Sequence, residues 1–233
     1  MDIINALTEE FGLRRGQVEK TVELLDGGNT VPFIARYRKE MTGSLDDQLL
    51  RSLSERLGYL RSLDETRQKI LAAIEEQGAL TDELAAAIDD AATLTELDDL
   101  YRPYKKKRKT RASAAKEKGL EPLAEKILEQ LPDSPAPERL AEEYIDPEKG
   151  VESAEDALAG ASDIIAELIS DDAGIRRRLR FVCSAHGLLF SKAAGDETGV
   201  YETYADYSEP LSKIPPHRVL AINRGEKEGA LKA

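Results

Sequence analysis

Apolar residues recur every three or four positions along most of the chain, which is the spacing of one face of an α-helix. The longest such stretch runs from Leu45 to Gln77, contains no proline and ends before Gly78. Asp64 and Arg67 interrupt a strict heptad there, so the pattern favours a bundle helix over an independent coiled coil. We therefore predict one long helix, or two nearly continuous ones, at the centre of a multi-helix bundle.

Helix-start and helix-stop signals divide the rest of the chain. Thr93 and Glu96 form a T-x-x-E capping box, and Pro103 ends the helix that follows it. The clearest connector is L-P-D-S-P-A-P at residues 131–137. We predict an N-terminal helical domain with a basic connector at 1–131, a linker at 132–150 and a second helical region at 151–233.

The sequence changes character after Gly187. Residues 188–190 (L-L-F) and three tyrosines spaced three residues apart, at 201, 204 and 207, fit either short strands or an irregular arm. A last helix starts near residues 215–216 (P-P). The predicted fold class is all-α, with a short irregular or minor β segment near 188–210.

Composition supports this class and limits the others. The chain holds 30 Leu and 29 Ala against 7 Val and 14 Ile, which favours helices over a β-sandwich or a parallel sheet. The longest apolar run, residues 84–88, is far shorter than the ~20 residues of a membrane span. The single cysteine and the lack of a basic N-terminal signal favour a cytoplasmic protein with no membrane partner.

The distribution of charge differs from its total. The net charge of −12, from 45 acidic and 33 basic residues, points away from nucleic acid when it is taken alone. Along the chain, however, residues 64–99 carry −9, residues 101–118 carry +8 and residues 121–172 carry −13. A dense basic stretch therefore lies between two acidic ones.

The basic segment, residues 101–111 (Y-R-P-Y-K-K-K-R-K-T-R), is the main candidate site. Its candidate phosphate-contacting residues are Lys105, Lys106, Lys107, Arg108, Lys109 and Arg111. Five consecutive cations cannot all find local partners, and Tyr101 and Tyr104 beside them are positioned to stack on bases. The segment either contacts nucleic acid or docks on the acidic helices of its own domain; a targeting signal is a third, weaker interpretation.

A second basic group follows the apolar residues 33–35 (F-I-A). Arg36, Arg38 and Lys39 are either further phosphate-contacting residues or the polar end of an amphipathic helix, and the local pattern favours the helix end. We include all three among the candidate nucleic-acid-binding residues.

The motifs of catalysis are missing from the sequence. There is no G-x-x-x-x-G-K-[ST], G-x-G-x-x-G, C-x-x-C or H-E-x-x-H, and two histidines with one cysteine cannot build a typical zinc site. Cys183 and His186 have the spacing of a nucleophile and a base, but nothing nearby supplies an orienting group. We interpret Cys183 as a partly buried structural residue, and we expect no enzyme, no catalytic residues, no metal and no cofactor.

Several ordered segments resemble the bacterial transcription accessory protein (Tex) family. The segments are V-P-F-I-A-R-Y-R-K-E at 31–40, T-G at 42–43, L-D at 45–46, R-L at 56–57, Y-L-R at 59–61, the stretch 75–97, the stretch 100–124, I-P at 214–215, H-R at 217–218 and N-R-G-E-K-E-G at 223–229. The resemblance extends through nearly the whole chain, and residues 132–150 are its least distinctive part.

The resemblance implies that the chain is the helical front of a longer protein. Proteins of this family continue into a nuclease-like domain, a helix-hairpin-helix module and an S1-type RNA-binding domain. The expected function is a helical scaffold that assists transcription through weak, sequence-nonspecific contact with RNA or DNA. The alternative is a protein-interaction scaffold that docks transcription machinery such as RNA polymerase and binds no nucleic acid itself.

Overall fold

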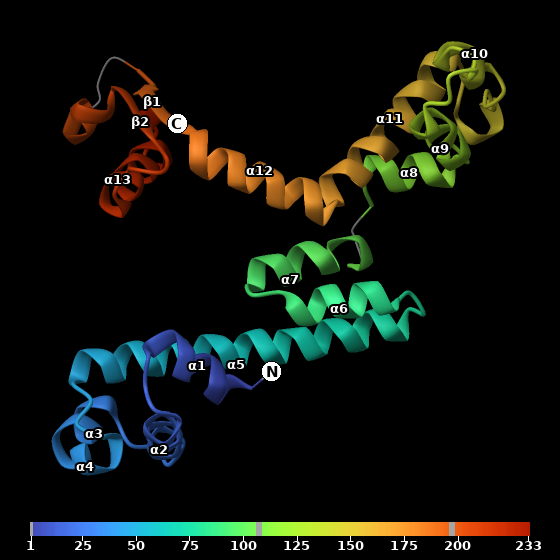
Figure 1. Cartoon of the computed structure of the whole chain (residues 1–233). Coiled ribbons are helices and arrows are strands. Elements are labelled where there is room, and N and C mark those ends of the chain that lie inside the picture. Colours follow the sequence, from blue (N-terminus) through green and yellow to red (C-terminus); the bar gives the residue numbers. More distant parts are fainter. Residues whose placement is uncertain (1, 106–108, 196–198) are drawn as a thin grey trace. The chain divides into compact units, whose positions relative to one another are not determined.

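The computed structural model describes residues 2–105, 109–195 and 199–233, and the chain forms two compact units, Met1–Tyr104 and Lys105–Ala233. The elements of unit 1 are all helical: α1 (Ile3–Phe11), α2 (Arg15–Asp26), α3 (Val31–Tyr37), α4 (Lys39–Thr42), α5 (Asp47–Glu76), α6 (Asp82–Asp90), α7 (Leu94–Tyr101) and the 3-10 turn η1 (Arg102–Tyr104) (Figure 1). Unit 2 contains α8 (Arg111–Glu117), α9 (Glu121–Glu129), α10 (Pro137–Glu142), η2 (Pro147–Lys149), α11 (Ala154–Asp171), α12 (Ala173–His186), β1 (Leu188–Ala193), η3 (Gly199–Tyr204), β2 (Asp206–Pro210), α13 (Pro216–Lys227) and β3 (Leu231–Lys232).

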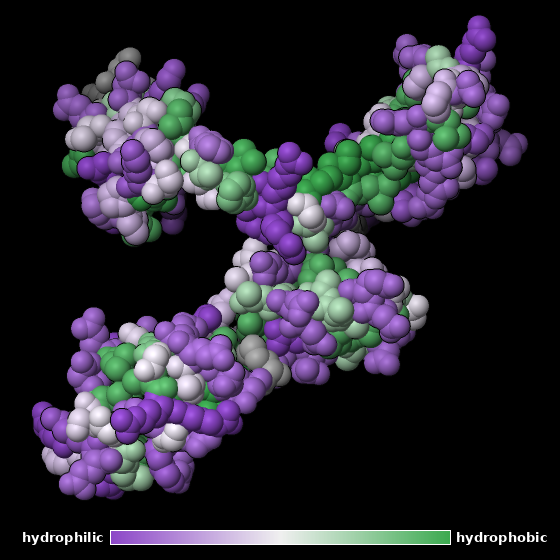
Figure 2. Space-filling view, in the orientation of Figure 1, coloured by the Kyte–Doolittle hydropathy of each residue, from purple (hydrophilic) through white to green (hydrophobic). Residues whose placement is uncertain are grey.

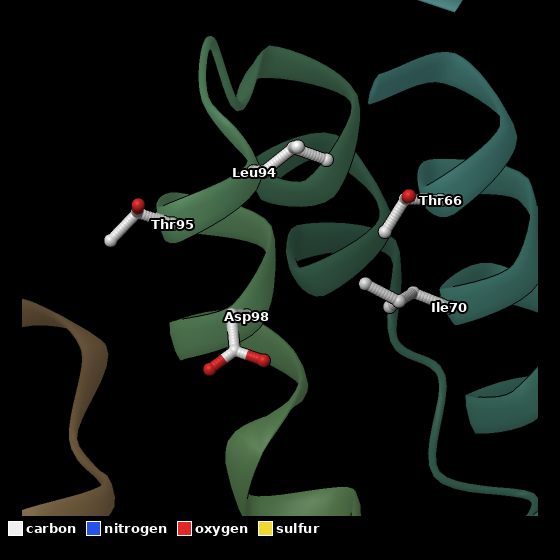
Figure 3. Close-up of a pocket in the computed structure, with 5 residues that line it drawn as sticks. All are labelled: Thr66, Ile70, Leu94, Thr95 and Asp98. Atoms are coloured by element: carbon white, nitrogen blue, oxygen red, sulfur yellow. The ribbon is translucent and has the colours of Figure 1, made fainter. Parts of the chain in front are cut away.

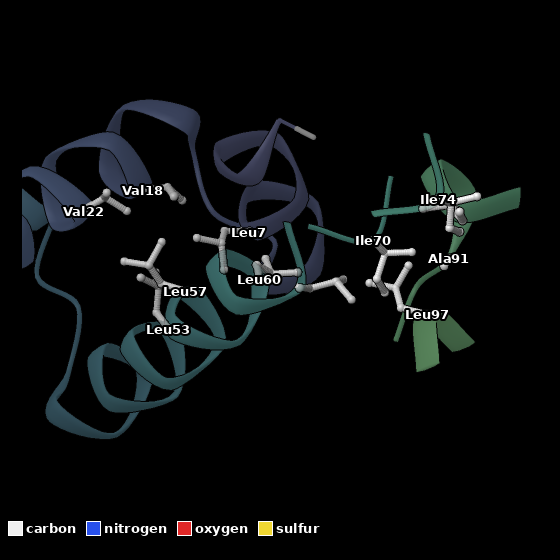
Figure 4. Packing of buried hydrophobic residues seen from close by; sticks show 12 residues of the cluster. Leu7, Val18, Val22, Leu53, Leu57, Leu60, Ile70, Ile74, Ala91 and Leu97 are labelled. Atoms are coloured by element: carbon white, nitrogen blue, oxygen red, sulfur yellow. The ribbon is translucent and has the colours of Figure 1, made fainter. Parts of the chain in front are cut away.

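Helix α5 is the central helix of unit 1, and its length confirms the prediction of one long helix there. Its 30 residues extend for about 45 Å at 1.5 Å per residue. One side of it is buried at Leu50, Leu53, Leu57, Leu60, Leu63, Arg67, Ile70 and Ile74. Side chains from α1 and α2 pack on its first half, and side chains from α6 and α7 pack on its second half (Figure 4).

Arg67 is the one charged residue on this buried side and is only 4% exposed. Its guanidinium donates to the carbonyl oxygens of Ile88 at 3.1 Å and Ala91 at 2.9 Å, at the end of α6. It also donates to the Asp64 carboxylate at 3.1 Å. The residue that interrupts the heptad therefore supplies buried donors to two carbonyls at the end of α6, where carbonyls lack the usual partner one turn further along the helix.

The short helix α7 begins as the sequence predicts. The Thr93 hydroxyl accepts from the Glu96 N–H at 3.1 Å, and the Glu96 carboxylate accepts from the Thr93 N–H at 3.2 Å. The box satisfies two backbone donors of the first turn. Pro103 then follows α7 within η1, as expected of a residue that cannot continue a helix.

Unit 2 is organised around α11. Helices α8, α9 and α10 pack on it, and the core includes Leu120, Leu140 and Ile164. Gly160 permits this packing, because a Cβ at that position would lie 2.3 Å from the Leu120 Cδ1. Within residues 132–150, where a linker was expected, Pro137 begins α10, and Leu140 and Ala141 of that helix are buried in this core. The chain divides into its two compact units at 104–105.

The C-terminal part of unit 2 contains a three-stranded antiparallel sheet of order β2-β1-β3. Its register pairs Leu188 with Pro210 and Ala193 with Leu231. With this small sheet in an otherwise helical chain, the structure confirms the all-α class with a minor β segment near 188–210. No helix in the described ranges is long and apolar enough to span a membrane.

Helix α12 carries none of its side chains in the core. Several large apolar residues are instead exposed on α11 and α12, where Figure 2 shows apolar atoms at the surface: Leu168, Ile169, Ile175, Leu179, Phe181 and Val182. The Cys183 side chain is exposed as well, so the prediction that it is partly buried is wrong. The physical reason is that Cys183 lies on α12, none of whose residues is buried.

Replacing Arg67 by Met should destabilise unit 1 by about 3 kcal/mol, because the carbonyls of Ile88 and Ala91 would lose their buried donor. Native-state hydrogen exchange of the whole chain measures this as lost protection in α6 and α7. The matched control on the same helix is Arg51→Met, whose exposed pair with Asp47 contributes less than about 1 kcal/mol. Equal effects of the two substitutions would show that the Arg67 hydrogen bonds do not hold α6 in place.

Candidate nucleic-acid interface

Within unit 1, the α3–α4 hairpin packs on α2 and α5. Ile34 is fully buried beside Leu24, Leu45 and Leu50 in a small core of its own. The Gln17 side-chain amide donates to the carbonyl of Thr42, the last residue of α4, at 3.1 Å. These contacts hold the hairpin by its inner side and leave the outer side to solvent.

Gly43 fixes the end of the hairpin. Its φ of 68° is in the left-handed region, and a Cβ at that position would lie 2.4 Å from the Gln17 Nε2. The chain can therefore turn from α4 towards α5 while the Gln17 amide keeps its hydrogen bond.

The structure places the second basic group on the outer side of this hairpin. Arg36 lies in the last turn of α3, Arg38 joins the two helices and Lys39 begins α4. All three are exposed, and within the described part of the chain none of them forms an ion pair. They are cations whose charge is available to a ligand.

Two of these cations line a shallow surface pocket of about 320 Å³. Its lining residues are Pro32, Ala35, Arg36, Lys39 and Asp47. The carboxylate of Asp47 accepts from the Arg51 guanidinium at 3.2 Å. The acid at this pocket is thus engaged by a neighbour on its own helix.

Aromatic rings lie beside these cations, a feature that the sequence analysis missed. Phe33 and Tyr37 are 37% and 60% exposed, and their ring centroids are 5.2 Å apart. The Arg38 guanidinium carbon lies 5.3 Å from the Phe33 centroid, within cation–π range. Phe33 and Tyr37 are four residues apart, which places both rings on one face of a helix. This spacing is the feature of the sequence from which the aromatic pair could have been predicted.

The candidate cations of the basic segment belong to unit 2. Lys105 and Lys109 are exposed, and Arg111 is the first residue of α8. Lys106, Lys107 and Arg108 lie outside the described residues. The predicted site residues are thus divided between the two units, with Arg36, Arg38 and Lys39 in unit 1.

The tyrosines of the basic segment do not have the expected exposure. Tyr101 and Tyr104 are partly buried and pack against the main core of unit 1. Gln77 also donates to the Tyr104 carbonyl at 3.2 Å, which ties the end of this turn to α5. Because their rings are engaged in packing, Tyr101 and Tyr104 are poorly placed to stack on bases.

Two cations of the basic segment pair with acids of their own unit. Lys109 lies 3.2 Å from Glu117, and Arg111 lies 3.3 Å from Asp163 on α11. Their side chains remain 72% and 88% exposed. Exposed pairs of this kind contribute at most about 1 kcal/mol, so a phosphate can compete with either carboxylate.

A second pocket, of about 420 Å³, lies between α5 and α7 (Figure 3). Its lining residues are Thr66, Ile70, Leu94, Thr95 and Asp98. The only charged group among these five is a carboxylate, which repels phosphate. Across the described ranges, no cluster of three or more His, Cys, Asp or Glu side chains could hold a metal ion.

The described molecule is therefore a predominantly helical protein with exposed basic groups on each of two units. Residues 1–75 match the Tex-like protein N-terminal domain, and residues 133–233 match the Tex central region. The chain belongs to the Tex family.

Named relatives agree with this assignment. The chain is 49% identical to Protein tex of Bordetella pertussis, over 98% of its own length and 29% of that protein. It is 42% identical to Transcriptional accessory protein Tex of Neisseria gonorrhoeae, over 99% and 30% of the two lengths. It is 30% identical to human S1 RNA-binding domain-containing protein 1, over 97% and 23%. The chain thus spans less than a third of the length of these curated relatives.

Replacing Glu117 by Gln and Asp163 by Asn together should change the free energy of unfolding by less than about 1 kcal/mol, because both ion pairs are exposed. Urea denaturation followed by helical circular dichroism measures this change. A loss of 3 kcal/mol or more would mean that the basic segment is a structural clasp on its own acidic helices.

Proposed function

We propose that this chain is a helical scaffold of a Tex-like transcription accessory protein and that it contacts RNA or DNA without reading sequence. The observation that carries the proposal is the group of three exposed cations, Arg36, Arg38 and Lys39. Among the described residues these side chains have no carboxylate partner, so their charge is not neutralised within the protein. We propose binding rather than catalysis for the site.

Phosphate contact fits the chemistry of the site. Arginine and lysine side chains bind phosphate oxygens through charge-assisted hydrogen bonds, and such contacts position a strand without specifying its sequence. Lys109 and Arg111 add exposed cations in unit 2, at the edge of the basic segment. The two groups together give each unit a place where a polyanion can bind.

The names of two relatives support a role in transcription and contact with a nucleic acid. One relative is named a transcriptional accessory protein, and another is named for an S1 RNA-binding domain. We propose transcription as the process and a nucleic acid as the partner on this basis. Because the chain spans less than a third of these relatives, its own contribution to binding is proposed to be weak and additive to theirs.

The alternative function is a scaffold for protein partners such as RNA polymerase. The observation in its favour is α12, whose exposed Leu179, Phe181 and Val182 are typical of a surface that another protein covers. The pairing of Lys109 and Arg111 with acids of unit 2 favours it too. The two functions predict different effects of salt on the binding of nucleic acid.

Binding of a short duplex should weaken steeply with salt. If the six cations of the basic segment each contact one phosphate, log affinity falls against log salt with a slope near −5. For a duplex bound at the α3–α4 hairpin, each cation contributes about −0.9 to the slope, so replacing Arg36, Arg38 and Lys39 by Gln should reduce that slope by about 2.7. Fluorescence anisotropy at several salt concentrations measures both slopes.

The matched control replaces Arg15, Lys20 and Lys69 by Gln. These three exposed cations of unit 1 each pair with an acid one helical turn away, so their loss should leave the slope unchanged. Binding that is undetectable, or equally sensitive in the two triple variants, would contradict site-specific phosphate contact. Loss of polymerase capture without any effect on nucleic acid would favour the alternative.

A further inference from the structure

We infer that Tyr37, backed by Phe33, is a stacking platform for one unpaired base of a single-stranded nucleic acid. This inference rests on the proposed function and adds a ligand feature to it. Proteins bind single strands by stacking bases on exposed aromatic rings and by holding the neighbouring phosphates with cations. The α3–α4 hairpin presents exposed rings and cations side by side in the sequence.

The rings and the Arg38 guanidinium form a short series. The guanidinium lies over the Phe33 ring at 5.3 Å, and the Phe33 and Tyr37 rings are tilted by 45° with centroids 5.2 Å apart. Tyr37 is at the outer end of this series and is 60% exposed. Its ring is therefore held by a neighbour and still open to a ligand.

The position of the hairpin explains why these rings stay outside the core. Of the consecutive residues Phe33 and Ile34, the fold buries Ile34 and leaves the larger ring exposed. Gln17 and Gly43 hold the end of the hairpin, so rotating Phe33 inward would break the contacts of α4 with α2. An exposed aromatic pair on a fixed scaffold is a preorganised surface, which reduces the entropy cost of binding.

Charge decides which kind of ligand fits. Residues 31–43 contain three bases and one acid, Glu40, and the nearby Asp47 is engaged by Arg51. Arg36 and Lys39 line the surface pocket described above, together with Asp47. An anionic strand with flat bases matches this surface better than a neutral apolar peptide, which would leave both cations unused.

The geometry also separates single strands from duplexes. In a duplex the bases are already stacked and paired, so only phosphates reach a convex helical surface. In a single strand one base can turn onto Tyr37 while its neighbouring phosphates contact Arg36 and Lys39. The aromatic contribution should thus be confined to single strands, whereas the cationic contribution applies to both.

Replacing Tyr37 by Leu tests this difference, because Leu keeps an apolar side chain but has no π-face. The probes are fluorescein-labelled oligo(U) and oligo(dT) of twelve nucleotides and a twelve-base-pair duplex. The variant should bind both single strands about tenfold more weakly and the duplex within twofold of the original chain, and Tyr37→Phe should restore single-strand binding.

A fluorescence measurement gives a direct readout of stacking. The chain contains no tryptophan, so Tyr37→Trp introduces a single one at the platform. Saturating oligo(dT) should quench its fluorescence strongly. The control is Leu128→Trp on α9, a 43% exposed position outside the basic groups, where quenching should be absent.

The outcomes separate this inference from the proposed function. If Tyr37→Leu leaves single-strand binding unchanged while the Arg36, Arg38 and Lys39 triple variant weakens it, the stacking platform is overturned and phosphate contact stands. If the original chain binds neither single strands nor duplex, both are overturned. If oligo(U), added in the same way, quenches the introduced tryptophan and oligo(dT) does not, the platform is specific for RNA; quenching by both assigns it to single strands in general.

Discussion

The structure of unit 1 depends on burying one face of α5. In proteins, most of the stability of a helix comes from packing rather than from its own hydrogen bonds. Helix α5 has an apolar stripe along its whole length, and the burial of this stripe stabilises it. The helices α1 and α2 cover one half and α6 and α7 the other, so α5 determines where each of them lies. The α3–α4 hairpin buries Ile34, with Val31 and Ala35 packed beside it, in a separate small core. Its outer side chains are consequently not needed for packing.

Because the outer side of the α3–α4 hairpin is not needed for packing, an acidic protein can carry cations there for a polyanion. Interactions between exposed charges are largely screened beyond about 8 Å at physiological salt, so a phosphate responds to its immediate neighbours more than to a total of −12. At the α3–α4 hairpin the cations Arg36, Arg38 and Lys39 outnumber the acids Glu40 and Asp47. In unit 2, Glu117 and Asp163 offset part of the charge of Lys109 and Arg111 and weaken that group as a phosphate site.

Local signals predicted much of the fold. The three- and four-residue spacing gave the long helix, and the Thr93–Glu96 box gave the start of α7, since both depend on residues within one or two turns. The burial of Leu140 depends on contact with α11, so the proline-rich sequence around it indicated a linker. The choice of Ile34 over Phe33 for the core is likewise a tertiary effect. The cations of the candidate site were therefore predicted from sequence, but the exposed rings beside them were not.

The most direct test of the account is photo-crosslinking of the whole chain to a single strand containing 4-thiouridine, with the crosslinked peptides identified by mass spectrometry. Nucleic-acid contact at the α3–α4 hairpin and the basic segment predicts crosslinks in residues 31–43, centred on Tyr37, and in the peptides that contain Lys105, Lys109 and Arg111. It also predicts that excess unlabelled oligo(U) removes them. Crosslinks confined to the acidic surfaces of α9 and α11, or none above the level of a protein of similar charge without these basic groups, would contradict it.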